Sequence, residues 1–287
     1  MSSSASASSA ETVVVIEPTK GWAGLKLRDI WEYRELLYFL IWREVKIRYK
    51  QTLLGAAWAV LQPLATMVVF TIFFGKLAQI GSDGLPYPIF SYTGLLPWTF
   101  FAEAVAKSSG VLVGSSNLLT KVYFPRLILP LSAVLSGIVD FAIAFVILIG
   151  MMAYYGFWPS AAVVCLPLLL LLACASALGI GMLLAALNVK YRDVRYVVPF
   201  VVQIWLFVTP VIYPASKATG KLAEMGLPTW LYGLNPMVGV VEGFRWALLG
   251  SGHPGPLIAT GAVMTFLLLL GGGLYFRRME RTFADVV

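Results

Sequence analysis

Long apolar runs constrain the fold of this chain more than any other feature of its sequence. Of the 287 residues, 59% are hydrophobic and only 12% are charged, and the mean hydropathy of +0.83 exceeds what a soluble domain can bury. A helix of about 20 apolar residues crosses roughly 30 Å of hydrocarbon. We therefore expect an all-α integral membrane protein with six transmembrane helices, at about residues 55–78, 87–111, 127–153, 161–187, 197–213 and 256–276. The fifth run is barely long enough, and Pro199 and Pro210 interrupt it.

The positions of the basic residues predict the orientation of these helices. Eight Lys and Arg residues precede the first expected span, and three more lie in each of the segments 107–126, 190–195 and 277–281. Loops rich in Lys and Arg remain on the cytoplasmic side of a membrane. Both termini should therefore be cytoplasmic. Because the cations gather at span ends, the net charge of +7 does not indicate a nucleic-acid partner.

The start of the chain differs from the rest in composition. Its first residues are small and polar, and they lack the basic start and the apolar core of a secretory signal. We expect no cleaved signal, and residues 1–24 should form a disordered cytoplasmic tail because they offer little to bury. Residues 25–287 should form a single transmembrane domain.

A helix over residues 25–52 should precede the first span. Its apolar and aromatic residues recur at helical spacing on one face, and its basic residues lie off that face. Such a helix lies flat in the membrane interface with its cations toward anionic headgroups. The candidate headgroup contacts are Trp42, Arg43, Lys46, Arg48 and Lys50. The helix is either a plain anchor or also a lever that contacts a cytoplasmic partner.

The segment before the last expected span is apolar but too short to cross the membrane. Asn235 and Pro236 break it and leave about 14 residues, 236–249. We expect an outer-leaflet re-entrant or interfacial helix that Asn235 caps and in which Pro236 occupies the first turn. Glu242 and Arg245, three residues apart, can pair on one face of this helix.

Two acidic residues lie inside expected spans, where an unpaired charge is costly. Glu103 has Lys107 four residues later, which favours a local ion pair. Asp140 has no basic residue within a helical turn. Small residues share its face, namely Ser132, Ser136 and Gly137. Because such faces mark packed helix interfaces, Asp140 either forms structural hydrogen bonds or acts in gating or substrate contact.

A metal site is not expected. The chain has one histidine, His253, and two cysteines, Cys165 and Cys174. Metal clusters need more Cys and His ligands than this. The two cysteines are nine residues apart on one expected helix and therefore lie on opposite faces, so they cannot form a disulfide with each other.

Several sequence motifs occur in a distinctive order. After the interfacial helix come "LLGAAWAVLQPL" in the first span, the cytoplasmic links "SSNLLTKVYFPRLILPLSAVL" and "LNVKYRDVRYVVPF", and "NPMVGVVEGFRWALLG" before the last span. Over residues 25–287 this order closely resembles the permease subunit of type-2 ABC exporters, in the branch that exports lipid-linked polysaccharides such as O-antigen, teichoic acid and capsule. The resemblance implies a multi-pass transport permease of the bacterial cytoplasmic membrane and not an enzyme.

The same resemblance implies the partners. Two copies of a separate ATPase subunit would bind ATP and magnesium and serve a permease dimer, with membrane lipids and the lipid-linked polysaccharide as further partners. Neither Gly75-Lys76 nor Gly220-Lys221 belongs to a P-loop, so we expect no cofactor in this chain. A permease for a drug or a small lipid is an alternative. A membrane-bound glycan polymerase or transferase is a further one, but it needs a convergent acid, base or metal set.

The segment 115–130 is the expected contact with that ATPase. Before Phe124 it has too few apolar residues to enter the bilayer, and its Ser and Asn residues can cap a short helix that Pro125 ends. Exposed leucines and aromatics on such a helix are costly unless a partner covers them. The expected coupling residues are Asn117, Leu118, Leu119, Lys121, Val122, Tyr123 and Arg126. Alternatively, this helix folds back onto the inner face of the chain itself.

Aromatic and uncharged polar residues at span depth are candidates for lining a pathway. Ring faces suit sugars, and amide and hydroxyl groups match sugar hydroxyls. The same aromatics are also typical of a membrane-interface belt. The candidates are Trp58, Gln62, Thr66, Trp98, Phe101, Gln203, Trp205 and Tyr213.

Overall fold

The chain is helical throughout the part that the structure describes. The computed structural model describes residues 27–50, 57–251, 255–280 and 283, and these contain no β-strand. The predicted tail at 1–24 lies outside them. The elements are α1 Leu27–Glu32, α2 Arg34–Lys50, α3 Ala57–Phe70, η1 Thr71–Leu77, α4 Tyr87–Gly114, α5 Ser116–Lys121, α6 Ile128–Tyr155, η2 Ala161–Cys165, α7 Leu166–Lys190, α8 Val194–Val208, α9 Ala215–Glu224, η3 Thr229–Leu234, α10 Pro236–Leu249 and α11 Gly255–Met279.

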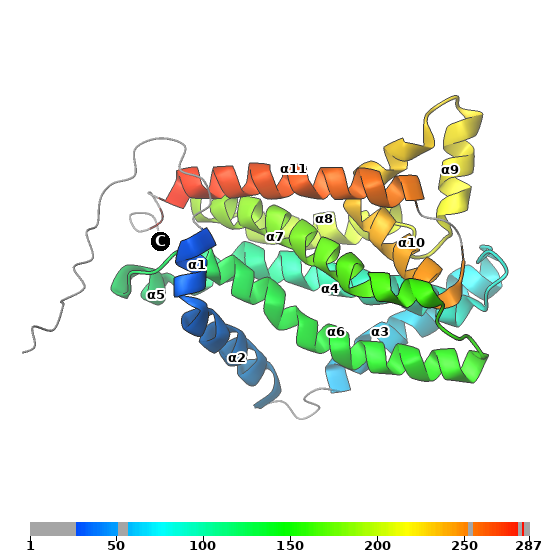
Figure 1. The fold of residues 1–287 in the computed structure, drawn as a ribbon, viewed down its shortest axis with the longest axis horizontal. Helices are drawn as coiled ribbons and strands as arrows, with labels where there is room; N and C mark the ends of the chain where they lie inside the picture. Colours follow the sequence, from blue (N-terminus) through cyan, green and yellow to red (C-terminus); the bar gives the residue numbers. More distant parts are fainter. Residues whose placement is uncertain (1–26, 51–56, 252–254, 281–282, 284–287) are drawn as a thin grey trace, which may run out of the picture.

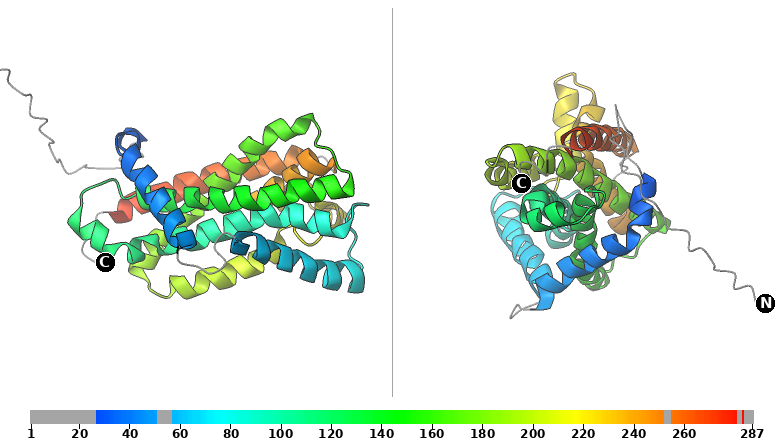
Figure 2. Two further views of the ribbon diagram at one scale, coloured as in Figure 1. Left: turned by 90° about the horizontal axis from the view of Figure 1, so that it is seen from below. Right: turned by 90° about the vertical axis from the view of Figure 1, so that its left-hand side faces the viewer.

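Long helices run side by side along the length of the molecule (Figure 1). The most extensive contacts join α4 with α7, α7 with α11, and α4 with α6, and α3 and α8 pack against α4 from its remaining sides. Helix α2 crosses the bundle obliquely and contacts α6 (Figure 2). One end of the bundle carries α5 and is called the α5 end below, and the opposite end carries α9 and α10 and is called the α10 end (Figure 1).

Four helical stretches of the described ranges are long and apolar enough to cross a membrane. They are Ala57–Leu77, Ile128–Tyr155, Ala161–Lys190 and Gly255–Met279. These coincide with the first, third, fourth and sixth predicted spans. The second predicted span corresponds to α4, which has 28 residues but is more polar because it is the central helix and buries its serines and threonines. The chain is therefore a multi-pass membrane protein.

The fifth predicted span is shorter than expected. Helix α8 has 15 residues, which measure roughly 22 Å at 1.5 Å per residue. Pro199 lies inside α8, whereas the helix ends two residues before Pro210. A non-helical segment, residues 209–214, follows and leads into α9 and η3, which the sequence did not predict.

Glycine permits a close contact between the backbones of α7 and α11. A Cβ atom at Gly272 of α11 would lie 2.1 Å from the carbonyl oxygen of Gly179 in α7. Along the same contact the hydroxyl oxygens of Ser176 and Thr265 are 2.7 Å apart. Small residues of this kind let transmembrane helices approach closely, and both α7 and α11 also contact α10.

Candidate functional site

The α10 end of the bundle is organised around the start of α10. As predicted, Asn235 caps this helix, because its side chain accepts a hydrogen bond from the Met237 backbone N–H at 3.1 Å. Pro236 occupies the first turn, also as predicted. The Asn235 amide donates to the Thr209 hydroxyl at 2.9 Å. Helix α10 is therefore tied to the non-helical segment that follows α8.

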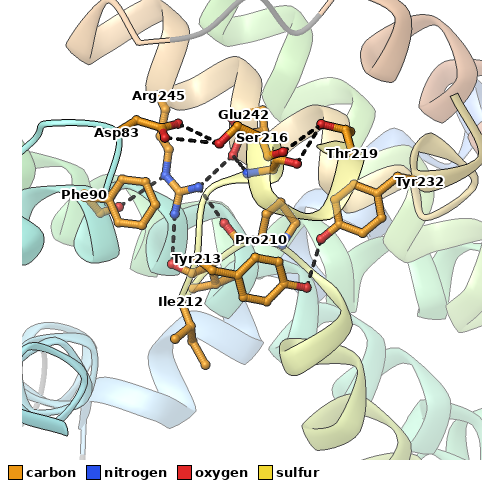
Figure 3. A network of polar contacts seen from close by, with 12 residues as sticks. Asp83, Phe90, Pro210, Ile212, Tyr213, Ser216, Thr219, Tyr232, Glu242 and Arg245 are labelled. Atoms are coloured by element: carbon orange, nitrogen blue, oxygen red, sulfur yellow. Dashed lines mark hydrogen bonds and ion pairs between the residues drawn. The ribbon is translucent and has the colours of Figure 1, made fainter. Parts of the chain in front are cut away.

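Arg245 lies at the centre of this end (Figure 3). It is 1% exposed, and its Nε donates to the Phe90 carbonyl of α4 at 3.3 Å. Its Nη1 donates to the Pro210 carbonyl at 2.5 Å and to the Glu242 carboxylate at 2.8 Å, and its Nη2 donates to the Val211 carbonyl at 2.8 Å. The predicted Glu242–Arg245 pair is confirmed. The contacts of Arg245 with other helices were not predicted.

Tyrosine hydroxyls satisfy further carbonyl groups around the end of α8. The donor and acceptor pairs are Tyr87 with Ile212 at 2.7 Å, Tyr213 with Phe207 at 3.0 Å and Tyr232 with Val208 at 3.0 Å. Non-helical backbone at membrane depth is tolerated only where the protein satisfies its polar groups. Arg245 and these tyrosines therefore allow α8 to stop early.

A second polar site lies between α2, α4 and α6, and we call it the charge cluster. Asp140 of α6 pairs with Arg48 and accepts a hydrogen bond from the Tyr49 hydroxyl, both from α2. The Lys107 ammonium is 3.8 Å from Asp140 and 2.7 Å from Glu103, so the predicted Glu103–Lys107 pair is confirmed. Burial raises the pKa of the Tyr49 phenol, which keeps it a hydrogen-bond donor.

The contacts of Asp140 show what holds this side chain in place. The small residues on its face do not bond to it, because Ser132 and Ser136 donate to carbonyls of their own helix. Asp140 is instead held by the side chains of α2. Asp140 therefore has a structural role, in which an ion pair and a hydrogen bond attach α2 to α6, and its role in gating or substrate contact stays a prediction.

The basic residues of α2 fall into two groups, those that pair with acidic residues and those that are exposed. Arg48 is turned inward to the charge cluster, and Arg43 pairs with Glu44 at 3.0 Å. Lys46 and Lys50 are exposed, as is Trp42. The apolar residues of the helix also divide, since Leu40 is buried against the bundle whereas aromatic side chains project outward. The predicted single apolar face is wrong, because α2 packs on protein with its leucines and presents its rings on the other side.

The predicted coupling segment contains both buried and exposed residues. Leu119 is 6% exposed and packs in a cluster formed by the ends of several helices, so the expectation that it faces a partner is wrong. Leu118 is half-buried against the same cluster. Arg126 is engaged within the chain, since its guanidinium donates to the Glu280 carbonyl and its backbone N–H donates to the Glu280 carboxylate at 3.4 Å. The exposed members are Asn117, Lys121, Val122 and Tyr123.

The predicted pathway residues do not form one surface. Trp98 and Phe101 are 4% and 0% exposed because α4 is the central helix, so the prediction that they line a pathway is wrong for this chain alone. Trp205 of α8 packs edge-on against Phe101, with ring centroids 5.4 Å apart. Trp58 and Gln203 are exposed on different helices. Gln62 is exposed beside Trp58, Thr66 donates to the Gln62 carbonyl, and Tyr213 belongs to the α10 end.

The contacts of Arg245 generate a stability prediction. Arg245→Met takes the donor from three carbonyl groups and leaves the Glu242 carboxylate only its bond from the Ala215 backbone N–H, and breaking a buried ion pair costs about 3–5 kcal/mol. The thermal-unfolding midpoint of the purified protein should fall by several degrees. Arg278→Met removes an exposed cation from the last turn of α11 and should leave the midpoint unchanged. Equal midpoints for both variants would show that Arg245 does not hold the α10 end together.

Comparison of the sequence with known proteins identifies its family. Residues 35–249 match the family model described as ABC-2 type transporter. The chain is 32% identical over 264 residues to the O-antigen export system permease protein RfbA of Myxococcus xanthus, and the match covers 91% of this chain and 98% of the relative. It is 23% identical over 254 residues to the protein of the same name from Klebsiella pneumoniae, and this match covers 88% of this chain and 95% of the relative. It is 26% identical over 260 residues to the polysialic acid transport protein KpsM of Escherichia coli, and this match covers 84% of this chain and 92% of the relative. Because the family model spans most of the chain, this protein belongs to the ABC-2 type transporter family.

Proposed function

We propose that this chain is the membrane-spanning permease subunit of an ATP-driven exporter that moves a lipid-linked polysaccharide across the bacterial cytoplasmic membrane. The observation that carries the proposal is the 32% identity over nearly the full length of a relative named for O-antigen export. O-antigen is therefore the foremost substrate class, with teichoic acid or capsule as further members. In this proposal the membrane is crossed six times, the α5 end, where α1 begins and α11 ends, faces the cytoplasm together with both termini of the chain, and α10 lies at the outer leaflet.

The proposed energy source is a separate ATPase subunit in two copies, which binds ATP and magnesium. Its docking surface would be the exposed part of the coupling segment, Asn117, Lys121, Val122 and Tyr123. Val122 and Tyr123 are 50% and 72% exposed, and such apolar side chains at a cytoplasmic surface favour a partner that covers them. The buried Leu119 and the bonded Arg126 would transmit force from this surface to the bundle instead of contacting the ATPase.

A second copy of this chain would complete the pathway. Helices α3 and α8 each carry an exposed apolar face, and Gln203 is an exposed polar residue on the face of α8. An amide at span depth is unfavourable against lipid tails, which supports a polar pathway beside α8 in the assembled dimer. Gln203 is the predicted lining residue that remains available for it.

The docking proposal predicts a selective loss of coupling. Tyr123→Asp should abolish both surface export of the glycan and co-purification of the ATPase, because it places a charge in the proposed apolar contact. Tyr154→Asp is the matched control, since Tyr154 is 84% exposed near the far end of α6, and it should retain ATPase binding. Membrane insertion is checked for both. If the ATPase remains bound to the Tyr123→Asp variant at wild-type levels, the main contact with the ATPase lies elsewhere.

The exposed lysines of α2 predict a charge-dependent contact with the lipid headgroup. Each cation near a membrane surface contributes on the order of 1 kcal/mol. Replacing Lys46 and Lys50 with Gln should therefore weaken binding of a polyprenyl diphosphate lipid to the purified complex by about tenfold or more. Replacing both with Arg should preserve the affinity. Equal losses in the two variants would attribute the effect to side-chain packing and not to phosphate charge.

A further inference from the structure

An open pocket lies between α3, α4 and α6, next to the charge cluster. The space along its lining atoms is about 420 Å³, and this figure includes the part that is open to the outside. Its walls offer ring faces, an amide, a hydroxyl and two carboxylates. These come from Trp58, Phe100, Gln62, Thr99, Glu103 and Asp140. All three helices belong to one copy of the chain, so the pocket is distinct from a pathway formed between two copies.

The depth of the pocket makes its polar lining unfavourable against lipid tails. Glu103 lies 11 residues before the end of α4, and Asp140 lies 12 residues after the start of α6. Both carboxylates are therefore roughly 17 Å along their helices from the α5 end. Ionisable groups at this depth normally face water, protein or a polar substrate, because contact with lipid tails is strongly unfavourable. Gln62 adds an exposed amide at the mouth of the pocket.

The balance of charge selects the class of ligand. Two cations, Arg48 and Lys107, already pair with the two carboxylates, so a cationic ligand would find no net negative charge. An anionic ligand would face the carboxylates, because these and not the cations line the pocket. A paired carboxylate still has lone pairs that accept hydrogen bonds from hydroxyl groups. Gln62 and Thr99 supply both donors and acceptors, and the ring of Trp58 suits an apolar face.

We propose that this pocket binds one sugar ring of the lipid-linked glycan, next to its diphosphate. The inference rests on the proposed function and adds where a single copy recognises the sugar. Through the Arg48–Asp140 pair, the pocket borders α2, whose exposed lysines are the proposed headgroup contact. The lipid diphosphate would lie along α2 while the attached sugar enters between Trp58 and the carboxylates. The pocket would thereby distinguish a glycan-bearing lipid from the bare lipid before transport begins.

Protection of an introduced cysteine tests this directly in the purified permease–ATPase complex. Cys165 and Cys174 are replaced by Ser, and Gln62→Cys is labelled with a water-soluble maleimide. The probes are a polyprenyl diphosphate with one sugar and the same lipid without the sugar. The sugar-bearing lipid should slow labelling several-fold more than the bare lipid. Trp158→Cys, at a site that is 86% exposed outside the pocket, should be labelled equally with either probe.

Binding measurements on pocket variants provide the second test. Trp58→Ala and Gln62→Ala change exposed side chains outside the ion pairs, so they leave the attachment of α2 intact. Each should weaken binding of the sugar-bearing lipid by about tenfold, as the loss of a ring contact or one to two hydrogen bonds predicts. Binding of the bare lipid should not change. Trp31→Ala, an exposed aromatic of α1, is the control that should affect neither lipid.

Each other outcome rejects the inference in a recognisable way. If the sugar-bearing lipid binds but Gln62→Cys stays unprotected, the proposed function stands and the pocket is not the sugar site. If both lipids protect equally, the pocket holds the lipid chain or the diphosphate. If Gln62→Cys is unreactive without lipid or cross-links to a second copy, the partner subunit covers the pocket. If neither lipid binds the complex, both the pocket and the proposed lipid-linked substrate are rejected.

Discussion

The buried guanidinium of Arg245 is the interaction on which the α10 end of this protein depends. Five N–H groups that leave water have to find acceptors, or the cost of burial is not offset. Helix α10 supplies Glu242, α4 supplies the Phe90 carbonyl, and the interrupted end of α8 supplies two more carbonyls. Gly94 belongs to the same arrangement, since a Cβ there would lie 2.7 Å from Arg245 Nη2. One side chain thus fixes three helices at the end that we place at the outer leaflet.

The charge cluster plays the corresponding role toward the α5 end. There the acceptor is Asp140, and the donors come from α2, a helix that lies across the bundle and not within it. The buried leucines of α2 and Leu119 of the coupling segment pack in the same apolar cluster. A movement imposed on the coupling segment would therefore reach α2, and through Asp140 the wall of the sugar pocket. This connection joins the proposed ATPase contact to the proposed site of substrate recognition.

Local patterns in the sequence predicted local features, whereas contacts between helices needed the structure. The cap at Asn235 and the two short-range ion pairs depend on residues within four positions of each other, and all three are confirmed. Arg48 and Asp140 are separated in the chain by α3, η1, α4 and α5, so helical spacing carried no information about their pairing. Leu119 was placed by the expected exposure of its short helix, and Trp98 and Phe101 by residue type and position in a span. Their burial depends on which helix occupies the centre of the bundle, and hydropathy cannot predict this because the central helix α4 is among the less apolar ones.

Transport in a defined system tests the central claim most directly. The purified chain and its ATPase would be reconstituted in vesicles with a fluorescent lipid-linked polysaccharide, and protection of the glycan from an added glycosidase would be followed over time. We predict protection that requires both ATP and the ATPase subunit. Extension or transfer of sugars by vesicles that contain this chain alone, without ATP, would identify an enzyme and contradict the account. Equal ATP-driven movement of a small lipid that carries no glycan would contradict the assignment of a polysaccharide substrate.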